Sequence, residues 1–567
     1  MNYPAAFPVY QVDTIRDLLF QIAERYGDRT ALAGKRAGRY EPVSYRELRD
    51  RVEALATALL HRGFGRGDRI ALLAENRPEW AVTYFAVVSL GATIVPLDRD
   101  LTAGELSHLL RFSEARALFA SSDHLRMLDA GGGLPSLPLL VRFDEAVGIG
   151  EQEYSDLLRE GREAVGEDKR RFLEVNIDPD LPAALIFTSG TTGAPKGVVL
   201  SHRNIVSNVT GVSYHVAINH DDVLLSVLPL HHTYEATAGF LTALYQGASV
   251  YYAESLRRVA DNLREVRPTV LLGVPALFEA MYRRIEAGIV EAGRGKFRLA
   301  RLAAGIGEKV LGSRARRRIF SRIHERFGGR LRLLISGGAA IDPRVVRGFR
   351  ELGIDFLQGY GLTEYSPIIS VNRVDHYKDG SVGLPLPHTE VRIVDDEIVV
   401  RGPCLMQGYY KNAEATAEVI REGWLYTGDL GYLDKDGFLF ISGRRKSVIV
   451  TPNGKNVYPE ELESLLNQSP YILESLVWGG PDPDPSKTEV QAIIVPDTQA
   501  LDAEFGPDGW DETKLQSLIA GEVQRVNRQL ARYKRIRRFV LRREEFEKTT
   551  TRKIKRYLYT ARSQVPR

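Results

Sequence analysis

The sequence predicts an α/β protein in which a large N-terminal domain of parallel αβ sheets is followed by a smaller α+β domain. Three observations predict this class. The chain has 567 residues, which is more than one hydrophobic core normally uses. Short apolar runs alternate with helical patterns over most of the length, as in parallel sheets covered by helices. After about residue 380 the pattern changes to short alternating strands.

Helices and strands alternate from residue 44 onward. In two places a Ser or Thr is followed three residues later by Glu and then by apolar residues at helical spacing, which is the capping-box pattern that begins a helix. Apolar runs between these helical patterns indicate strands. We expect helices from Ser44, over 78–90 and from Thr102, and strands over 69–74, 91–96, 183–187, 224–228, 249–252, 270–273 and 331–335.

The last third of the chain has two further patterns. Short alternating strands at 390–394, 397–401 and 438–442 predict a distorted antiparallel barrel. Beyond them, a helix from Pro459, strands at 475–478 and 490–495 and a helix over 515–530 predict a separate α+β domain. We therefore expect an N-terminal domain over 1–442, a hinge at 443–446 and a mobile C-terminal domain over 447–567.

Composition excludes several function classes. The formal net charge of +3 is nearly neutral, so nothing global indicates nucleic-acid binding. A single cysteine, Cys404, excludes an intramolecular disulfide and a cysteine-rich metal site, and it suits a reducing compartment. The N-terminus has no signal-peptide pattern, and no run of 18 apolar residues indicates a spanning helix. A cytoplasmic enzyme is expected.

The first chemical motif is a loop that can grip phosphate. The strand at 183–187 leads into small and hydroxyl residues over 188–193, and Lys196 follows. Backbone N–H groups in such a loop approach an anion closely, hydroxyls add donors and the lysine adds positive charge. The glycine spacing differs from that of a Walker A loop. By itself, a loop of this composition is also typical of a plain surface turn.

The second motif, Gln358 to Glu364, follows a predicted strand end, where open α/β sheets bind ligands. Tyr360 can stack on a base, Thr363 can bond a phosphate oxygen, and Glu364 can hold Mg²⁺, which prefers carboxylate and phosphate oxygens. A glycine-rich turn with a packed tyrosine is the structural alternative.

Three later motifs are weaker by themselves. Asp429, in Tyr-Thr-Gly-Asp, can accept hydrogen bonds from ribose hydroxyls. The basic run at 443–446 can bind the ribose or phosphate of a nucleotide, and it can also form a hinge between domains. The lysine-rich tail over 548–556, taken alone, is typical of a solvated terminus.

Five motifs resemble, in their order along the chain, the signatures of the adenylate-forming superfamily, which includes acyl-CoA synthetases, luciferases and peptide-synthetase adenylation domains. They are TSGTTGAPKG, GYGLTE, TGD, GRRK and TTTRKIKR. The resemblance extends from about residue 14 to residue 559. It implies the two-domain fold of that superfamily. It also implies ATP-dependent conversion of an acid to acyl-AMP, release of pyrophosphate, and transfer of the acyl group to coenzyme A.

The resemblance also implies roles for individual residues. Mg²⁺ would be held by Glu364 and Thr188. Catalytic roles fall on Lys553, which bridges the carboxylate and the α-phosphate, on Thr363 and on Lys446 as the hinge. ATP-binding residues would be Thr188, Ser189, Gly190, Thr191, Thr192, Lys196, Gly338, Ala339, Gln358, Tyr360, Gly361, Thr363, Asp429 and Arg444.

Two of these assignments have neighbours that compete with them. His232 matches the histidine that walls the acyl site and is counted as catalytic, but His231 stands beside it. The superfamily's lysine usually follows glycine, whereas Arg552 stands there in this chain. The choice of Lys553 over Lys555 rests on the Ile-x-Arg that follows.

The acid is inferred from further resemblance. LPLHHTYE, GLTEYSP and a basic helical insert resemble long-chain fatty acyl-CoA synthetases, and small residues at Ser366, Pro367 and Gly337 are expected to leave a pocket open. Medium-chain or aryl acids, and ligases that load a carrier protein, are the alternatives. A non-catalytic nucleotide or fatty-acid sensor is disfavoured, because Lys196, Glu364 and the terminal lysine are all present.

The basic insert over 294–330 holds about a dozen lysines and arginines against Glu308 and Glu325, with apolar residues at helical spacing. It is interpreted either as a solvated face of a packed helix or as a surface that contacts anionic membrane peripherally. The expected partners are the fatty acid, ATP and coenzyme A. Nucleic acid is not expected, and a homodimer is one oligomeric state left open.

Overall fold

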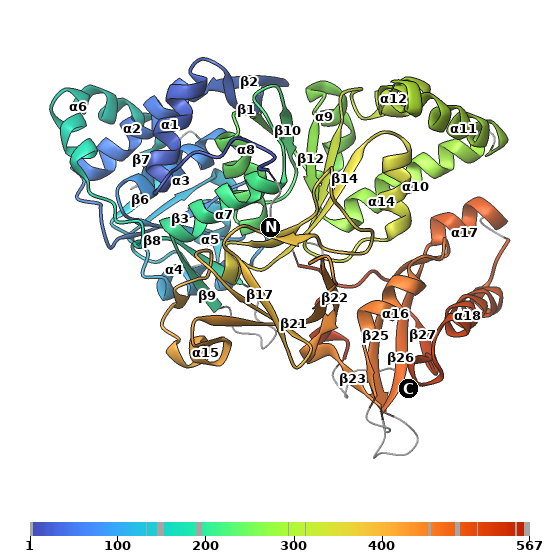
Figure 1. Cartoon of the computed structure of the whole chain (residues 1–567). Coiled ribbons are helices and arrows are strands. Elements are labelled where there is room, and N and C mark those ends of the chain that lie inside the picture. Colours follow the sequence, from blue (N-terminus) through green and yellow to red (C-terminus); the bar gives the residue numbers. More distant parts are fainter. Residues whose placement is uncertain are drawn as a thin grey trace. The chain divides into compact units, whose positions relative to one another are not determined.

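The computed structural model describes residues 4–131, 133–144, 152–188, 196–292, 294–311, 313–451, 455–481, 488–506, 509–549 and 553–560. The chain, which Figure 1 colours by residue number, divides into two compact units. Unit 1 comprises Met1–Gly338, Val346–Glu390 and Val400–Leu425; unit 2 comprises Ala339–Val345, Val391–Val399 and Tyr426–Arg567. The hinge expected at 443–446 lies within unit 2.

Unit 1 contains two large sheets. The described strands of the first, in spatial order, are β19 (Gly408–Tyr409), β9 (Lys196–Ser201), β8 (Pro182–Thr188), β4 (Thr93–Pro96), β3 (Arg69–Leu73), β5 (Ala117–Ala120), β6 (Leu139–Arg142) and β7 (Gln152–Glu153). From β8 to β7 neighbouring strands are parallel. The central strands β4 and β5 are buried along their whole length, which explains their continuous apolar runs.

The second sheet is also mainly parallel. Its described strands, in spatial order, are β16 (Leu384–Pro385), β15 (Ile368–Val371), β14 (Asp355–Gly361), β13 (Leu333–Ser336), β12 (Val270–Gly273), β10 (Val223–Ser226), β11 (Ser249–Tyr252), β1 (Thr30–Arg36) and β2 (Arg39–Ser44). Antiparallel pairs lie at the two ends, β1 with β2 and β15 with β14 and β16. The parallel centre therefore matches the α/β class that the alternating pattern predicts.

Helices connect these strands. Both expected capping boxes, at Ser44 and Thr102, are present, and they begin helices because each side chain accepts an end N–H that lacks a helical partner. The helices of unit 1 are α1 (Ile15–Tyr26), α2 (Tyr45–His61), α3 (Pro78–Ser89), α4 (Ala103–Phe112), α5 (Ser122–Ala130), α6 (Tyr154–Glu174), α7 (His202–His215), the π-helix η1 (Tyr234–Leu241), α8 (Thr242–Tyr245), η2 (Leu256–Arg258), α9 (Val259–Val266), α10 (Pro275–Ala292), α11 (Arg294–Leu311), α12 (Ser313–Ile319), α13 (Ser321–Arg326), α14 (Pro343–Glu351), which begins in unit 2, η3 (Thr363–Tyr365) and α15 (Ala413–Val419).

A further sheet contains the short strands expected after residue 380. Its strands are β17 (Glu390–Val394), β18 (Glu397–Arg401), β21 (Trp424–Leu433), β20 (Ile420–Arg421) and β22 (Leu439–Arg444), of which β21 pairs antiparallel with β20 and β22. The strand expected at 438–442 thus continues to Arg444, so that Arg444 is a strand residue.

The rest of unit 2 is the expected α+β region. Three strands form its sheet, with β25 antiparallel and β27 parallel to the central β26, and α16 packs on β25 (Figure 1). Leu462, Val477 and Ile519 belong to one buried cluster beneath these elements. The elements are η4 (Arg445–Ser447), β23 (Ile449–Val450), β24 (Asn456–Val457), α16 (Pro459–Leu466), β25 (Ile472–Pro481), β26 (Thr488–Pro496), α17 (Thr498–Phe505), α18 (Glu512–Gln529), η5 (Arg532–Lys534), β27 (Arg538–Leu541) and η6 (Arg556–Leu558).

The α/β class is therefore confirmed, and so are the expected elements, with ends that shift by a few residues. A buried cluster that includes Leu73, Val95 and Leu118 lies between the first sheet and α4 and α5. None of the helices that the structure describes is long and apolar enough to cross a membrane.

Candidate functional site

The phosphate-gripping loop predicted by the sequence starts at the carboxyl end of β8. β8 and β9 pair antiparallel, with Thr188 opposite Lys196, and the Thr188 hydroxyl donates to the Lys196 carbonyl oxygen at 3.4 Å. Residues 189–195, which include Ser189, Gly190, Thr191 and Thr192, lie outside the described residues. The strand pair therefore places both ends of the loop together at the carboxyl end of β8.

Tyr409 connects the two motifs of unit 1. The Lys196 ammonium lies 4.7 Å from the centre of the Tyr409 ring, and the Tyr409 hydroxyl donates to Glu364 Oε1 at 2.8 Å. Burial, followed by the charge of Glu364, raises the pKa of Tyr409 above its ordinary value, so the hydroxyl stays protonated and remains a donor. Tyr409 was not predicted as a site residue, because the only local signal was an aromatic pair after a glycine.

The turn after β14 needs its glycine. A Cβ on Gly361 would lie 2.0 Å from the Pro367 carbonyl oxygen, to which the Leu362 N–H donates at 2.9 Å. Tyr360, just before this turn, is buried, and the Gln358 carbonyl accepts from the N–H of Asn372. The close chain crossing therefore fixes the direction in which η3 leaves the sheet.

Thr363 and Glu364 lie on η3. The Thr233 hydroxyl is 3.5 Å from the Thr363 hydroxyl, and the Glu364 carbonyl accepts from the Met406 N–H at 2.9 Å. Lys196, Tyr409 and Glu364 thus form one connected polar group, with Thr363 beside Glu364 on the same short helix. A cation, a carboxylate and hydroxyls in this arrangement suit a phosphate with a hard metal ion.

The small residues expected to open a pocket pack against the protein itself. A Cβ on Gly337 would lie 2.7 Å from Cζ of the Tyr234 ring. Ser366 is completely buried, and its hydroxyl donates to the Cys404 carbonyl at 2.9 Å. That expectation was wrong for these two residues, because Gly337 leaves room for the Tyr234 ring and Ser366 bonds the backbone at Cys404. Gly338 has a φ of 87°, a conformation that favours glycine, and Ala339 is exposed.

In unit 2, Asp429 and Arg444 pair with each other. They face one another across β21 and β22, and Arg444 Nε lies 3.1 Å from Asp429 Oδ1. The Asp429 side chain is 8% exposed and that of Arg444 53%. Both residues were predicted to bind the ribose. Their ion pair was not predicted, because only the strand register brings them together.

Glu397 organises the neighbouring turn. One of its oxygens accepts from the Gly428 N–H at 2.8 Å, and the other lies 2.6 Å from Arg445 Nη1. Sequence analysis did not select Glu397 as a site residue. Lys446, the predicted hinge residue, is exposed on η4. Glu397 therefore links the turn before Asp429 to the basic segment that contains Lys446.

The described residues on either side of 550–552 in the lysine-rich tail pair with each other. Lys548 and Ile554 make an antiparallel bridge, the Thr549 N–H donates to the Lys553 carbonyl at 2.8 Å, and the Lys553 N–H donates to the Thr549 hydroxyl at 3.2 Å. Arg552 lies outside the described residues. These contacts between Lys548, Thr549, Lys553 and Ile554 are not expected of the solvated terminus that the composition suggests.

The two adjacent histidines follow β10. Asn76 holds this connection, since it accepts from the Leu230 N–H at 3.0 Å and donates to the Leu228 carbonyl at 2.7 Å. His231 is buried, whereas His232 is half-buried. Burial and the neighbouring His232 lower the pKa of His231 well below its ordinary value.

Two family models and several known proteins match this chain. A family model described as AMP-binding enzyme matches residues 19–410, and one described as AMP-binding enzyme C-terminal domain matches residues 446–562. A long-chain-fatty-acid–CoA ligase of Mycobacterium bovis is 33% identical over 529 residues, which cover 90% of this chain and 86% of the relative.

Two further likenesses are informative. A chloroplast long-chain-fatty-acid–[acyl-carrier-protein] ligase of Arabidopsis thaliana is 28% identical over 589 residues, covering 90% of this chain and 80% of the relative. The structure of ATP-bound MatB from Rhodopseudomonas palustris matches with a TM-score of 0.72 at 26% identity, covering 96% of this chain and 98% of that one.

Proposed function

The chain belongs to the AMP-binding enzyme family, and from this premise we propose that it activates a long-chain fatty acid with ATP and transfers the acyl group to coenzyme A. The observation that carries the proposal is the likeness to the mycobacterial long-chain-fatty-acid–CoA ligase, which extends over 90% of the chain. The enzyme is an acid–thiol ligase. Acyl-AMP forms first with release of pyrophosphate, and the thiol then displaces AMP.

In the first half-reaction the carboxylate attacks the α-phosphorus of ATP, and negative charge grows on the phosphate oxygens. Positive charge and fixed donors near those oxygens lower the barrier. We assign this role to Lys196 and Lys553, with the hydroxyls of Thr188 and Thr363. The position of Lys196 over Tyr409, which itself bonds Glu364, supports the assignment of Lys196.

The remaining nucleotide contacts are assigned by motif. Tyr360 stacks on the adenine, and Asp429 with Arg444 binds the ribose; their mutual ion pair supports a common ligand, since each keeps the other oriented. The other proposed contacts are Ser189, Gly190, Thr191 and Thr192 with the phosphates, and Gly338, Ala339, Gln358 and Gly361 around the adenine.

Mg²⁺ is the proposed metal cofactor. The residues present fit it, because the Glu364 carboxylate and the Thr188 hydroxyl are oxygen donors of the kind that Mg²⁺ prefers. The Tyr409 hydroxyl, 2.8 Å from Glu364 Oε1, orients that carboxylate. When bound, the ion would neutralise charge on the transferred phosphates.

The acyl group and the second half-reaction involve other residues. His232 is assigned to the wall of the acyl site, and its partial exposure, against the burial of His231, favours it over its neighbour. We propose that residues 447–567 turn about Lys446 between the half-reactions, which withdraws Lys553 and admits the thiol of coenzyme A. Closure and rotation of this kind let one site serve two steps.

The test is pyrophosphate release from ATP and Mg²⁺ over a series of saturated acids from acetate to stearate, with and without coenzyme A. Release that peaks at long chains, with thioester formed only when coenzyme A is added, is the expected result. A peak at medium-chain or aryl acids would contradict the long-chain assignment. If none of the acids in the series caused pyrophosphate release, the enzyme assignment would be contradicted.

Transfer to a carrier protein is a second candidate. The specific observation in its favour is the likeness to a chloroplast long-chain-fatty-acid–[acyl-carrier-protein] ligase. The two acceptors are separated by supplying coenzyme A and phosphopantetheinylated carrier protein in parallel reactions. Acyl-carrier product without acyl-CoA would replace the first proposal by the second.

We also propose that α11 contacts anionic membrane. Leu299, Leu302 and Ile306 are 70%, 67% and 64% exposed, and their spacing places them on one side of the helix. Arg298, Arg301 and Gly305 adjoin Leu302 and Ile306 on the same surface of α11. Apolar side chains flanked by arginines suit the interface of an anionic bilayer. A cytoplasmic protein that bound there would meet the fatty acid that has partitioned into the membrane.

Sedimentation with phosphatidylglycerol vesicles and with phosphatidylcholine vesicles tests this contact. The intact chain should bind the anionic vesicles, and the double variant Leu302→Glu with Ile306→Glu should not. Leu173→Glu is the matched control, since Leu173 is 48% exposed on a different helix. Equal binding of all three proteins would contradict the proposal. A dimer lost only in the double variant would assign the same surface to a second copy of the chain.

A further inference from the structure

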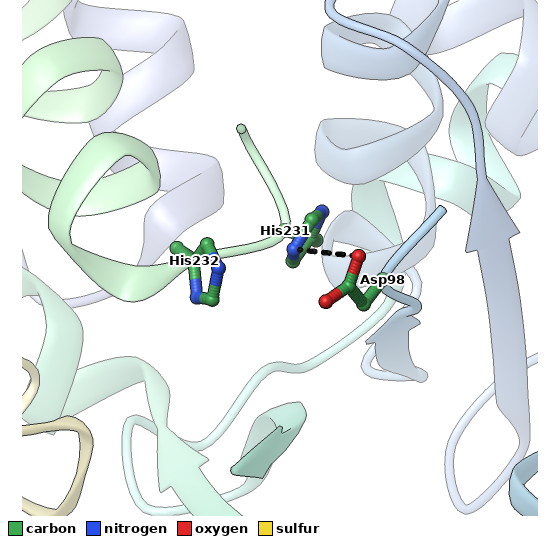
Figure 2. Close-up of side chains that lie close together, drawn as sticks. All are labelled: Asp98, His231 and His232. Atoms are coloured by element: carbon green, nitrogen blue, oxygen red, sulfur yellow. Dashed lines mark ion pairs between the residues drawn. The ribbon is translucent and has the colours of Figure 1, made fainter. Parts of the chain in front are cut away.

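Three side chains that metals commonly use lie together in unit 1. Asp98, His231 and His232 each offer one donor atom, and these atoms all lie within 4.8 Å of one another. Figure 2 shows the Asp98 carboxylate directed at His231, with His232 beside it. Asp98 follows β4 of the first sheet and the two histidines follow β10 of the second. The cluster thus lies where strand carboxyl ends, which commonly bind ligands, approach each other.

His231 Nε2 is an unusual buried polar atom. The side chain is 7% exposed, and Nε2 has no hydrogen-bond partner among the described residues. Its distance of 3.5 Å to Asp98 Oδ1 exceeds a normal hydrogen bond. Leaving such a group unsatisfied costs about 1–3 kcal/mol, so its position between two other donor groups requires an explanation.

The spacing fits two ligands of one ion. Donor atoms held at about 2.0–2.2 Å by a tetrahedral ion are separated by roughly 3.3–3.6 Å, and His231 Nε2 and Asp98 Oδ1 are 3.5 Å apart. The third donor lies within 4.8 Å and belongs to the half-buried His232.

The surroundings hold the carboxylate in a fixed orientation. Asp98 Oδ1 also accepts from the Asp100 N–H at 3.0 Å, which orients the carboxylate. The nearby cation Arg99 lies 3.8 Å from Asp100, so its charge is partly offset.

We propose that Asp98, His231 and His232 bind one divalent first-row transition-metal ion of the Zn²⁺ class. Two imidazole nitrogens and a carboxylate favour such an ion over Mg²⁺, which prefers oxygen donors. This site is separate from Glu364 and Thr188 and does not depend on the proposed reaction. Because His232 is also assigned to the acyl wall, an ion here would occupy the space beside the acyl group.

Metal binding is tested on the full chain, without an affinity tag or nucleotide, by equilibrium dialysis against Zn²⁺ and by the visible spectrum of the Co²⁺ complex. One equivalent of Zn²⁺ is expected, with Co²⁺ bands of a four-coordinate nitrogen–oxygen site. Asp98→Asn and, independently, His231→Gln should each weaken Zn²⁺ binding at least tenfold and remove the bands.

The exposed pair His220 and Asp221 supplies a matched control. These side chains are 3.6 Å apart and 53% and 76% exposed, so Asp221→Asn should leave the affinity unchanged. Unfolding temperatures of the apo proteins verify that each variant is folded. Less than one equivalent bound by the intact chain, or the same affinity in Asp98→Asn as in Asp221→Asn, would overturn the proposal.

Discussion

The backbone of Lys553 is hydrogen-bonded to Thr549. Both of its backbone groups bond Thr549, the N–H to the hydroxyl and the carbonyl to the N–H, and the residue is exposed. These two hydrogen bonds fix the backbone position from which the Lys553 side chain extends. Lys555, two residues later, lies instead 3.9 Å from Glu547.

Lys553→Ala should reduce acyl-AMP formation by about 10²–10³-fold, because one positive charge near the transferred phosphate is lost. Thioester formation from preformed acyl-AMP should change far less. The two half-reactions are measured separately, by pyrophosphate release and by acyl-CoA formation from synthetic adenylate. Lys555→Ala is the control; a larger loss in that variant would move the assignment to Lys555, and equal loss in both half-reactions would contradict the two-conformation account.

Glu235 is a fully buried carboxyl on the π-helix η1. Its Oε1 accepts from the Ser226 hydroxyl at 2.5 Å, whereas Oε2 has no hydrogen-bond partner among the described residues. Burial raises the pKa of Glu235 to about 8, so the side chain is neutral over most of the physiological range. Ser226 also accepts from Asn76 at 3.0 Å, which ties this carboxyl to the segment that presents the histidines.

A raised native pKa makes this part of the stability depend on pH. The stabilising effect of the bound proton is complete below the unfolded value of 4.5 and is lost as pH rises towards about 8, by at most roughly 1.4 kcal/mol per pH unit. Glu235→Gln keeps the shape and removes the titration. The Tm of the variant minus that of the intact chain should therefore rise between these pH values and then level off. A difference independent of pH would contradict the assignment.

At the scale of elements, contacts on both sides of Lys553 hold the lysine-rich tail (residues 548–556) to the rest of its domain, and the first of them lies on its C-terminal side. Arg556 on η6 lies 2.7 Å from Glu463 on α16 and donates to the Val477 carbonyl on β25 at 2.5 Å. Burial raises the pKa of Glu463, and Arg556 opposes that shift. From the other side, Lys548 lies 2.8 Å from Glu474. Both contacts connect the tail to the small domain's core.

Arg556→Ala should therefore displace Lys553 and also lower the stability of the domain. The loss leaves Glu463 buried without its cation, which costs about 3 kcal/mol, and acyl-AMP formation should fall at least tenfold with little change in thioester formation. Arg543→Ala is the control, because the Arg543–Glu512 pair is 85% and 60% exposed. Equal loss in both half-reactions would leave Arg556 a purely structural role.

At the scale of the whole molecule, the proposed catalytic groups are divided between the two units. Lys196, Tyr360 and Glu364 belong to unit 1, whereas Asp429, Lys446 and Lys553 belong to unit 2. A reaction that needs both sets depends on the connection between them. Of the named groups only Lys553 follows Lys446 in the chain, so the proposed rotation about Lys446 would move Lys553 and leave the other groups in place, which makes it testable.

Lys446→Pro should slow one half-reaction at least tenfold and leave the other within a few-fold, because proline restricts φ to one narrow range and so favours one domain arrangement. Acyl-AMP formation and thioester formation are again measured separately. Lys435→Pro is the control, since Lys435 lies in an exposed turn that the 434–438 hydrogen bonds already close. Unchanged rates of both steps in Lys446→Pro would contradict the hinge.

Much of the site could be predicted because its motifs are local. The Thr188 loop and the Gly361 turn follow strand ends, and strand ends are visible as apolar runs followed by small residues. Tyr409 and Glu397 escaped prediction because no motif surrounds them. They act on residues 45 and 31 positions away in the chain, and only folding brings such pairs together.

The sequence by itself determined the α/β class, the order of the elements, the family and the positions of the chemical motifs, because hydrophobic periodicity, capping residues and glycine spacing are local properties of the chain. Only the tertiary structure decided which side chains meet: Tyr409 with Glu364, Asp429 with Arg444, and Asp98 with the two histidines. The physical reason is that such contacts depend on sheet order and strand register, which are set by the packing of the whole core.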